Sequence, residues 1–448
     1  MTSTRFGART VHALALVVSL GMSAHTPLAY AGTALVGGGA TAPALGLLGT
    51  TDNQMQTSPS SSSLLGIYST QTGNPQTSYC MNGSGLGKQI LTGGGATMPP
   101  VSVQAPCING TTITTITKGF GAQALGRTDL LWPSFVVSDA PLTVVEYGNY
   151  ITNHASSNPI QFPMAAESIA ITFTKGNMQS LNLTDAQLCK LFSGQITDWS
   201  DPQLAATVPA GLSGPIQIVY DSDSSGTTFG LSNHLATVCP GTQQQHFIAD
   251  PLFTKVVSLY FPSWSGTPSL PSTWIARSGD QNVVNTILST DGTLGYAGTA
   301  DVINVLGLYA TVNGFDPVVD FASQGNGFYT ISTADIVYNQ VMNGTDPASG
   351  RPNYAAITPS PTTQCIVLVT PQSYAKAQGS GYPIVSIVYL LANAQGNKAD
   401  RPSLQNLMWA PYNTTVTRNS ALTSFGPYTG LALLTTSFTK WQIQNCIN

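Results

Sequence analysis

The residues best placed to do chemistry are the serines, glycine and threonines of the segment 224–229. This segment, Ser-Ser-Gly-Thr-Thr-Phe, follows an apolar, strand-like run at 216–220. A turn that leaves a strand and opens a helix aims backbone N–H groups and hydroxyls at one point, where the helix dipole adds partial positive charge. Such a turn can bind an oxyanion. Serine and threonine also cap ordinary helices, so a structural cap is the alternative for this segment alone.

Two further segments carry the same small and hydroxylated residues. Gly-Gly-Gly-Ala-Thr-Ala-Pro spans 37–43, and Val-Ser-Asp-Ala-Pro-Leu spans 137–142. In this order the three segments resemble those of the phosphate-binding proteins of bacterial phosphate transporters, most closely the secreted branch called DING proteins. The similarity covers nearly the whole mature chain and includes Phe-Ser-Gly and Asp-Trp within 183–199 and Gly-Tyr-Pro-Ile at 381–384. The Asp-Ile-Asn-Gly start that names the DING branch is absent, since residues 34–37 read Ala-Leu-Val-Gly.

The resemblance implies a set of ligand-binding residues. A bound anion is stripped of water, so each of its oxygens needs fixed donors. A buried carboxylate such as Asp139 can only accept, which favours hydrogen phosphate over fully ionised sulfate. The alternative for Asp139 is a helix cap before Pro141. The residues carried over by position are Thr41, Ala42, Ser84, Asp139, Ser225, Gly226 and Thr227.

One position departs from the family pattern. Asp221 stands where the family places an arginine that pairs with the anion, and the acidic partner of that arginine remains as Asp223. A charge contact at about 4 Å is worth about 1 to 4 kcal/mol between water-like and near-surface dielectrics. Because an aspartate in place of the arginine reverses the sign of this contact, we expect a loss of phosphate affinity of one or more orders of magnitude. A compensating cation, Lys88 or Arg127, could prevent this loss if it folds into the cleft. Weak phosphate binding and a different ligand both remain open.

Other motifs fail on their spacing. Residues 83–89 imitate a P-loop, but Asn82 replaces the first glycine and Gln89 the final serine or threonine. Asp221 and Asp223 imitate the start of a calcium loop, whose twelfth position is Ser232 instead of glutamate. The mature histidines lack zinc-site spacing, and Gly-x-Ser-x-Gly is absent. The sequence therefore predicts no metal, no cofactor and no catalytic residue.

The elements that must position these residues are short β-rich runs that alternate with helices, as in an α/β protein. The clearest strands are 169–173 and 216–220, and 184–192 is a helix with Thr184 as its N-cap. The resemblance implies a two-lobed, type II periplasmic-binding-protein (Venus flytrap) fold with an interlobe hinge and the ligand in the cleft. The expected domains are a signal peptide at 1–31, lobe I at 32–165 plus 300–448, and lobe II at 166–299.

Composition and the N-terminus predict an exported protein. Arg5 and Arg9 precede an apolar stretch at 12–22 and a small-x-small cleavage site at 29–31. No mature segment is apolar enough to span a membrane, so the expected location is periplasmic or extracellular. Charged residues make up 8% of the 448 residues, 15 basic against 19 acidic, which excludes a basic face for nucleic acid.

The six cysteines fit an oxidising compartment and allow 15 pairings. Proximity favours a bond between Cys80 and Cys107. The DING resemblance favours Cys189–Cys239, which leaves Cys365 and Cys446 as the remaining pair.

The leading hypothesis is a secreted solute-binding protein without catalysis, which closes its lobes on a small oxyanion, with inorganic phosphate as the expected ligand. A phosphate ABC permease is the implied partner. The first alternative is a secreted phosphoesterase that uses the same cradle, although no activated nucleophile with an adjacent base is visible. The second is an extracellular structural protein that has kept the fold and lost the ligand, which Asp221 favours.

Overall fold

The computed structural model describes residues 33–51, 55–93, 120, 125–127, 129–155, 157–262, 269–322, 328–358, 361, 363–376, 381–426, 428–435 and 438–448. Residues 31–448 form one compact unit. The predicted signal peptide at 1–31 lies outside the described residues. Within them, none of the helices has the length and hydrophobicity that a membrane crossing requires.

The centre of the molecule is one large mixed sheet. Its main path runs β2-β3-β1-β4-β16-β5-β9-β7-β8, with β6, β10, β11 and β17 attached at its sides, and two small antiparallel pairs, β12–β15 and β13–β14, stand apart. The strands are β1 (Leu35–Gly39), β2 (Met55–Gln56), β3 (Thr77–Met81), β4 (Phe135–Ser138), β5 (Pro159–Thr174), β6 (Asn182–Leu183), β7 (Gln217–Asp221), β8 (Ile275–Arg277), β9 (Thr293–Gly298), β10 (Tyr309–Val312), β11 (Phe328–Tyr329), β12 (Ile336–Tyr338), β13 (Gln340–Thr345), β14 (Pro352–Ala356), β15 (Val367–Val369), β16 (Val385–Asn393) and β17 (Leu431–Leu434).

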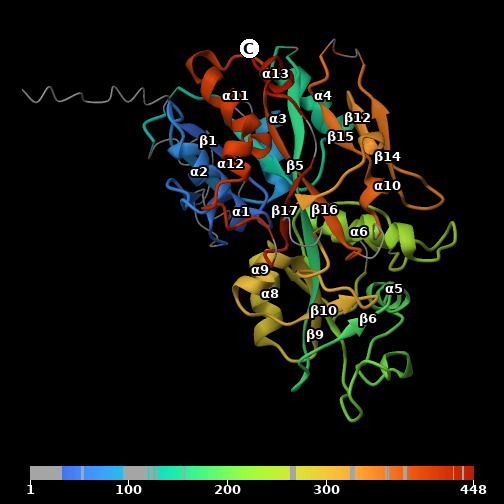
Figure 1. The fold of residues 1–448 in the computed structure, drawn as a ribbon. Helices are drawn as coiled ribbons and strands as arrows, with labels where there is room; N and C mark the ends of the chain where they lie inside the picture. The colour runs from blue at the N-terminus through green and yellow to red at the C-terminus, as the bar shows by residue number, and fades with distance from the viewer. Residues whose placement is uncertain are drawn as a thin grey trace, which may run out of the picture. The chain divides into compact units, whose positions relative to one another are not determined.

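Strand β5 is the long central strand that takes part in both halves of this sheet (Figure 1). Its first part pairs antiparallel with β16, from Pro159 opposite Asn393 to Ser168 opposite Val385. Its last part, from Ile169 to Thr174, pairs antiparallel with β9. The sequence named 169–173 as one of the clearest strands, whereas β5 begins already at Pro159. In the fold these residues are buried on both faces, which removes the alternation that marks a half-exposed strand.

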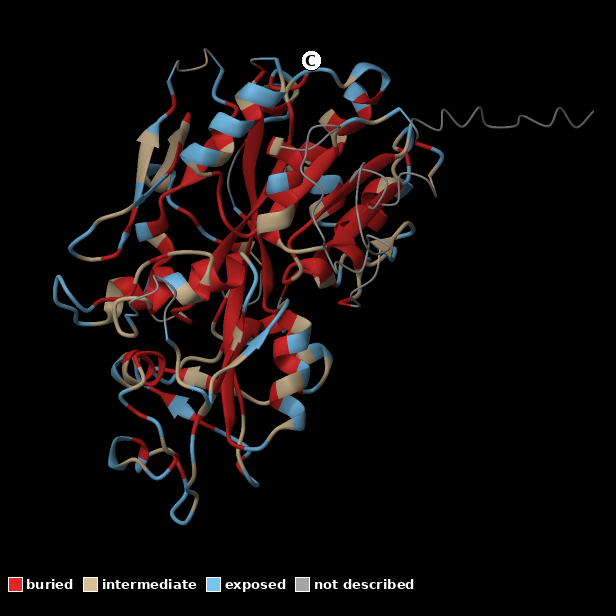
Figure 2. Ribbon diagram, turned by 180° about the vertical axis from the view of Figure 1, so that it is seen from behind, coloured by how far each residue is buried: buried red, intermediate tan, exposed pale blue. Residues whose placement is uncertain are grey.

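Parallel strands lie on either side of β5. In one half β1 pairs in parallel with both β3 and β4, and in the other half β7 pairs in parallel with both β8 and β9. Strand β10 pairs with β6 and with the far end of β5. Residues of the central strands are buried almost throughout, while several outer helices, such as α4 and α8, expose one side (Figure 2).

Helices begin directly after many of these strands. The prediction for 184–192 is confirmed, since α5 starts after Thr184, whose side chain forms a capping box with Gln187. The helices are α1 (Ala44–Leu48), α2 (Leu64–Thr70), α3 (Ser84–Gly93), α4 (Val144–Asn153), α5 (Asp185–Phe192), α6 (Gly226–Val238), α7 (Phe253–Val256), α8 (Asp280–Ser289), α9 (Thr299–Asn304), α10 (Pro371–Tyr374), α11 (Arg401–Trp409), α12 (Thr414–Thr417) and α13 (Lys440–Gln444).

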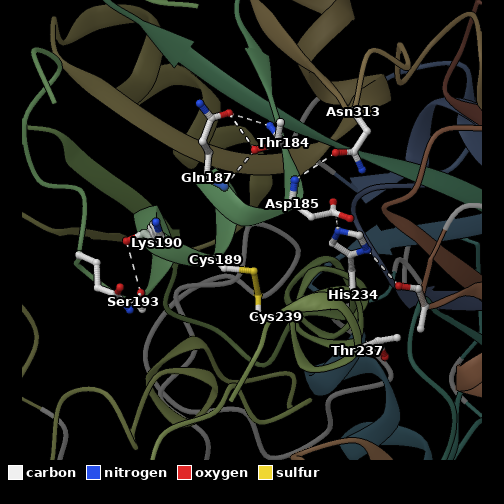
Figure 3. Close-up of a disulfide and its surroundings, with 12 residues drawn as sticks. Thr184, Asp185, Gln187, Cys189, Lys190, Ser193, His234, Thr237, Cys239 and Asn313 are labelled. Carbon is white, nitrogen blue, oxygen red and sulfur yellow. Dashed lines mark hydrogen bonds and ion pairs between the residues drawn. A yellow bond between two sulfur atoms is a disulfide. The ribbon is translucent and has the colours of Figure 1, made fainter. Parts of the chain in front are cut away.

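Two disulfides follow the predicted pairing. Cys189 of α5 is bonded to Cys239 at the end of α6, and beside this bond Asp185 contacts His234 of α6 at 3.2 Å (Figure 3). The pair formed by Cys365 and Cys446 ties the C-terminal helix to the strand β15 region. Cys80 is disulfide-bonded as well. Its predicted partner, Cys107, lies outside the described residues.

Candidate functional site

The segments singled out in the sequence meet at one edge of the sheet. Parallel strands present their carboxyl ends together, and in open α/β sheets ligands bind outside those ends. Thr41 and Ala42 follow β1, Ser84 comes shortly after β3, and Asp139 directly follows β4. The segment 222–227 follows β7 in the other half of the sheet.

The predicted oxyanion turn is the N-terminus of α6, a thirteen-residue helix that lies at the middle of the molecule (Figure 1). Ser225 is its N-cap, and the Ser225 hydroxyl accepts from the backbone N–H of Thr228. Gly226 and Thr227 are therefore the first two helical residues, whose N–H groups have no acceptor within a helix. The Thr227 hydroxyl donates to Asp280 Oδ2 at 2.8 Å. The strand–turn–helix arrangement predicted for this segment is confirmed.

Asp139 lies directly against this helix terminus. The Ser84 hydroxyl donates to Asp139 Oδ1 and also accepts from the backbone N–H of Asp139, at 3.1 Å. A Cβ atom placed on Gly226 would fall 1.7 Å from Asp139 Oδ1, so only glycine fits here. Burial, together with the charge of Asp280, raises the pKa of Asp139 to about 7.

Other close approaches join the two halves of the sheet around Asp139. The N–H of Gly85 donates to the carbonyl oxygen of Ser224 at 3.0 Å. A Cβ atom on Gly298, at the end of β9, would lie 2.7 Å from Cβ of Ala42. Ala42 is thus buried against the other half of the sheet, whereas Thr41 beside it is half-buried.

Asp221 has a structural task at this edge. Its side chain is buried at the end of β7, where Oδ1 accepts from the N–H groups of Asp223 (2.9 Å) and Gly279 (3.1 Å). Burial, with the charge of Asp280 as the second cause, raises the pKa of Asp221 well above its usual value. Asp223 is exposed and accepts from the hydroxyl of Ser278.

The two cations considered as replacements for the missing arginine are engaged elsewhere. Lys88 Nζ lies 3.1 Å from a carboxylate oxygen of Glu146 and 3.1 Å from the carbonyl oxygen of Pro141. Arg127 pairs with Asp129 and Asp400, each at 2.8 Å. Lys88 still lies close enough to act on the charge of Asp139. In the described part of the chain, no basic side chain forms an ion pair with Asp139 or Asp221.

Three buried acids at this edge were missed by sequence reasoning. Glu167 lies in the middle of β5, Asp280 is the first residue of α8, and Asp301 lies in the first turn of α9. The pKa of Glu167 and that of Asp301 are raised well above their usual values, chiefly by burial and then by neighbouring carboxylates. The charges of Glu167 and Asp139 act on each other, and the charge of Asp139 is, after burial, the largest cause of the raised pKa of Glu167.

Asp280 and Asp301 each lie near the start of a helix that follows a strand. No motif links them to the three segments recognised first. Together with those segments the acids make the candidate site rich in carboxyl groups. Among the described residues, however, no set of three or more His, Cys, Asp or Glu side chains has an arrangement suited to a metal ion.

A family model and curated relatives match this chain. The model of the PBP superfamily domain matches residues 31–364. Alkaline phosphatase L of Pseudomonas aeruginosa strain UCBPP-PA14 is 27% identical over 372 residues, which cover 75% of this chain and 84% of that protein. The same protein of strain PAO1 is 38% identical over 170 residues, 38% of this chain and 42% of that protein. A phosphate-binding protein of an unknown prokaryotic organism is 27% identical over 64% of this chain and 73% of its own length.

Solved structures share the fold. A high-affinity periplasmic phosphate-binding protein (PfluDING), bound with phosphate, superposes with a TM-score of 0.56 at 22% identity, covering 88% of this chain and 90% of its own. A phosphate-binding protein from Stenotrophomonas maltophilia gives a TM-score of 0.54 at 20% identity, covering 89% and 91%.

Proposed function

This chain belongs to the PBP superfamily and has the type II periplasmic-binding-protein fold, and we propose on that basis that it binds inorganic phosphate at the carboxyl edge of its sheet. The observation that carries the proposal is the meeting of the α6 N-terminus with the turns after β1, β3 and β4. Gly226 and Thr227 offer helix-terminal N–H groups, which is the usual setting for an oxyanion. Family members named as phosphate-binding proteins support the choice of anion.

In this proposal the seven residues named from the sequence contact the ligand. The backbone N–H groups of Ala42, Gly226 and Thr227 and the hydroxyls of Thr41, Ser84 and Ser225 donate to phosphate oxygens. Asp139 accepts the proton that hydrogen phosphate still carries. Since the Ser84 hydroxyl donates to Asp139, phosphate binding must redirect that hydroxyl or share it. The ligand set is Thr41, Ala42, Ser84, Asp139, Ser225, Gly226 and Thr227.

We also propose that the two halves joined by β5 are the lobes that close on the ligand. The first lobe contains residues 32–165 and the C-terminal part, and the second contains the middle of the chain. Because β10 pairs with β6, we set the return crossing after β10, further along than residue 300. The contacts Gly85–Ser224 and Ala42–Gly298 would then belong to a closed state. The disulfides suit a periplasmic or extracellular location, with a phosphate ABC permease as the implied partner.

Isothermal titration of the refolded, phosphate-stripped protein tests the binding proposal. We expect heat of binding and a rise in Tm at millimolar phosphate, and a weaker response for Ser84→Ala. Ser69→Ala is the matched control, because this serine lies in α2 and its hydroxyl donates only to the carbonyl oxygen of Leu65. No heat and no change in Tm for the unmodified protein would rule out phosphate as the ligand.

A phosphoesterase is the second candidate, and one contact favours it. The Ser84 hydroxyl donates to Asp139, whose pKa of about 7 suits a general base near neutral pH. Relatives named alkaline phosphatase L add a reason to test this activity. Turnover of a chromogenic phosphate monoester that disappears in Ser84→Ala and persists in Ser69→Ala would support it. Equal turnover by both variants would assign the activity to a contaminant.

A further inference from the structure

Asp280 is a buried acid in which one carboxyl oxygen accepts hydrogen bonds and the other has no partner among the described residues. Its side chain is 1% exposed. Oδ2 accepts from the Thr227 hydroxyl at 2.8 Å and from the N–H of Gly298 at 3.1 Å. Oδ1 has no hydrogen-bond partner among the described residues. A buried polar atom without a partner costs about 1–3 kcal/mol, so this oxygen calls for a partner that the described residues do not supply.

The position of Asp280 ties it to the proposed phosphate site. Thr227, which holds Oδ2, is the second residue of α6, and the N–H of Gly298 marks the start of α9. The charge of Asp280 acts on Asp139 and on Glu167. Asp280 is therefore bonded directly to one residue of the proposed phosphate site and acts electrostatically on another.

The surroundings of Asp280 favour its neutral form. Among the described residues, the charged side chain that raises the pKa of Asp280 is Asp223, and Lys88, which acts on the neighbouring Asp139, is paired with Glu146. Burial raises the pKa of Asp280 to about 6, and the two bonds to Oδ2 oppose this rise. The titratable groups around it are Asp139 after β4, Glu167 of β5, Asp221 and Asp223 after β7, Tyr296 of β9 and Asp301 of α9.

We infer that Asp280 is a specificity-determining residue of this site and binds phosphate as the neutral acid, donating from Oδ1 to a phosphate oxygen. The inference rests on the proposed function, since it concerns the same ligand. A protonated carboxyl supplies a hydrogen-bond donor to a site whose family arginine is replaced by Asp221. The same carboxyl, once ionised, repels the anion. The site therefore accepts phosphate together with a proton.

This arrangement predicts how affinity depends on pH. Below pH 6 Asp280 is already protonated in the free protein, so it adds no pH dependence there. Above pH 6 the free protein has lost this proton, and phosphate binding must take it up again. One proton taken up on binding lowers affinity about tenfold for each pH unit. The loss continues until pH exceeds the pKa of Asp280 in the complex.

Asp280→Asn separates this effect from the ionisation of phosphate itself. Asparagine keeps an oxygen for Thr227 and Gly298 and presents a permanent N–H donor in place of Oδ1. We expect the unmodified protein to lose about tenfold more affinity than Asp280→Asn for each pH unit between pH 6 and pH 8. Calorimetry at pH 7.5 in buffers of different ionisation enthalpy should show about one proton fewer taken up by the variant. Asp280→Ala, which has no donor, should bind at least tenfold more weakly than the unmodified protein at pH 5.5.

Asp335→Asn is the control, because this acid lies at η3 (Thr333–Asp335), away from the site, and should leave the pH profile unchanged. Parallel profiles for the unmodified protein and Asp280→Asn would overturn the inference. If Asp280→Asn does not fold, binding without net proton uptake by the unmodified protein at pH 7.5 would overturn it as well. Failure to bind phosphate at every pH is a different outcome, which removes the proposed function itself.

Discussion

At the scale of single residues, the main departure from the family pattern has a structural explanation. Asp221 replaces an arginine, and its carboxylate holds the chain after β7 by accepting from the N–H groups of Asp223 and Gly279. Arginine has no acceptor and could not make these bonds. A change back to arginine would therefore disturb the turn that leads into α6, besides adding charge. Asparagine is the cleaner substitution, because it keeps an acceptor oxygen and removes the negative charge.

We predict that Asp221→Asn binds phosphate more tightly than the unmodified protein at pH 8. Removal of one negative charge near the anion is worth about 1 to 4 kcal/mol, so we expect an increase of about tenfold or more. Isothermal titration at pH 8 and at pH 5.5 measures the change. At pH 5.5 the difference should shrink, because the raised pKa of Asp221 leaves more of it neutral there. Unchanged or weaker binding at pH 8 would show that Asp221 is remote from the ligand.

At the scale of elements, the sequence predicted the ends of helices and strands wherever a capping residue or a turn motif marks them. The capping residues Thr184 and Ser225 marked the starts of α5 and α6, since a side chain that caps a helix does so within a few residues. The Gly-rich and Ser-Asp turns marked the ends of β1 and β4. These local signals, in their order along the chain, carried the resemblance from which the fold was predicted.

The acid cluster could not be predicted in the same way. Glu167 lies in a strand buried on both faces, and Asp280 and Asp301 belong to two different helices. Only the pairing of β5 with β16 and β9, and of β7 with β9, brings these residues together. Long-range pairing of this kind leaves no local pattern. The gathering of these acids at the site can therefore be seen only once the sheet is assembled.

The start of α6 offers a prediction about packing. Gly226→Ala should lower phosphate affinity at least tenfold and cost about 1–3 kcal/mol of stability, because the new Cβ would overlap Asp139 Oδ1. Gly148→Ala in α4 is the matched control, since a Cβ there meets nothing within 4 Å. Alanine in a helix interior should stabilise the protein by about 0.5–1 kcal/mol. Titration with phosphate and urea unfolding measure both effects. Equal behaviour of the two variants would contradict the close packing of Gly226 on Asp139.

At the scale of the whole molecule, the buried acids link folding to pH. Asp139 and Asp280 have pKa values of about 7 and about 6 in the folded protein, against 3.8 for an ordinary aspartate. The folded state therefore binds more protons than the unfolded chain between pH 4 and pH 7. Under that condition the free energy of unfolding decreases as pH rises. Exposed acids such as Asp198 and Asp346, whose pKa values are lowered, act in the opposite sense below pH 4.

We therefore predict that the phosphate-free protein has its highest Tm near pH 4 and a lower Tm at pH 8. Each unit of pKa shift corresponds to about 1.4 kcal/mol, so the combined change amounts to several kcal/mol and should be measurable by circular dichroism. In the double variant Asp139→Asn, Asp280→Asn the decline in Tm from pH 5 to pH 8 should be much smaller, whereas Asp335→Asn should keep it. Saturating phosphate should raise Tm more at pH 6 than at pH 8, because the ligand binds the protonated site. A Tm that rises steadily from pH 5 to pH 8 would mean that these carboxyl groups are solvated in the folded protein, and would remove the basis for proton-linked binding.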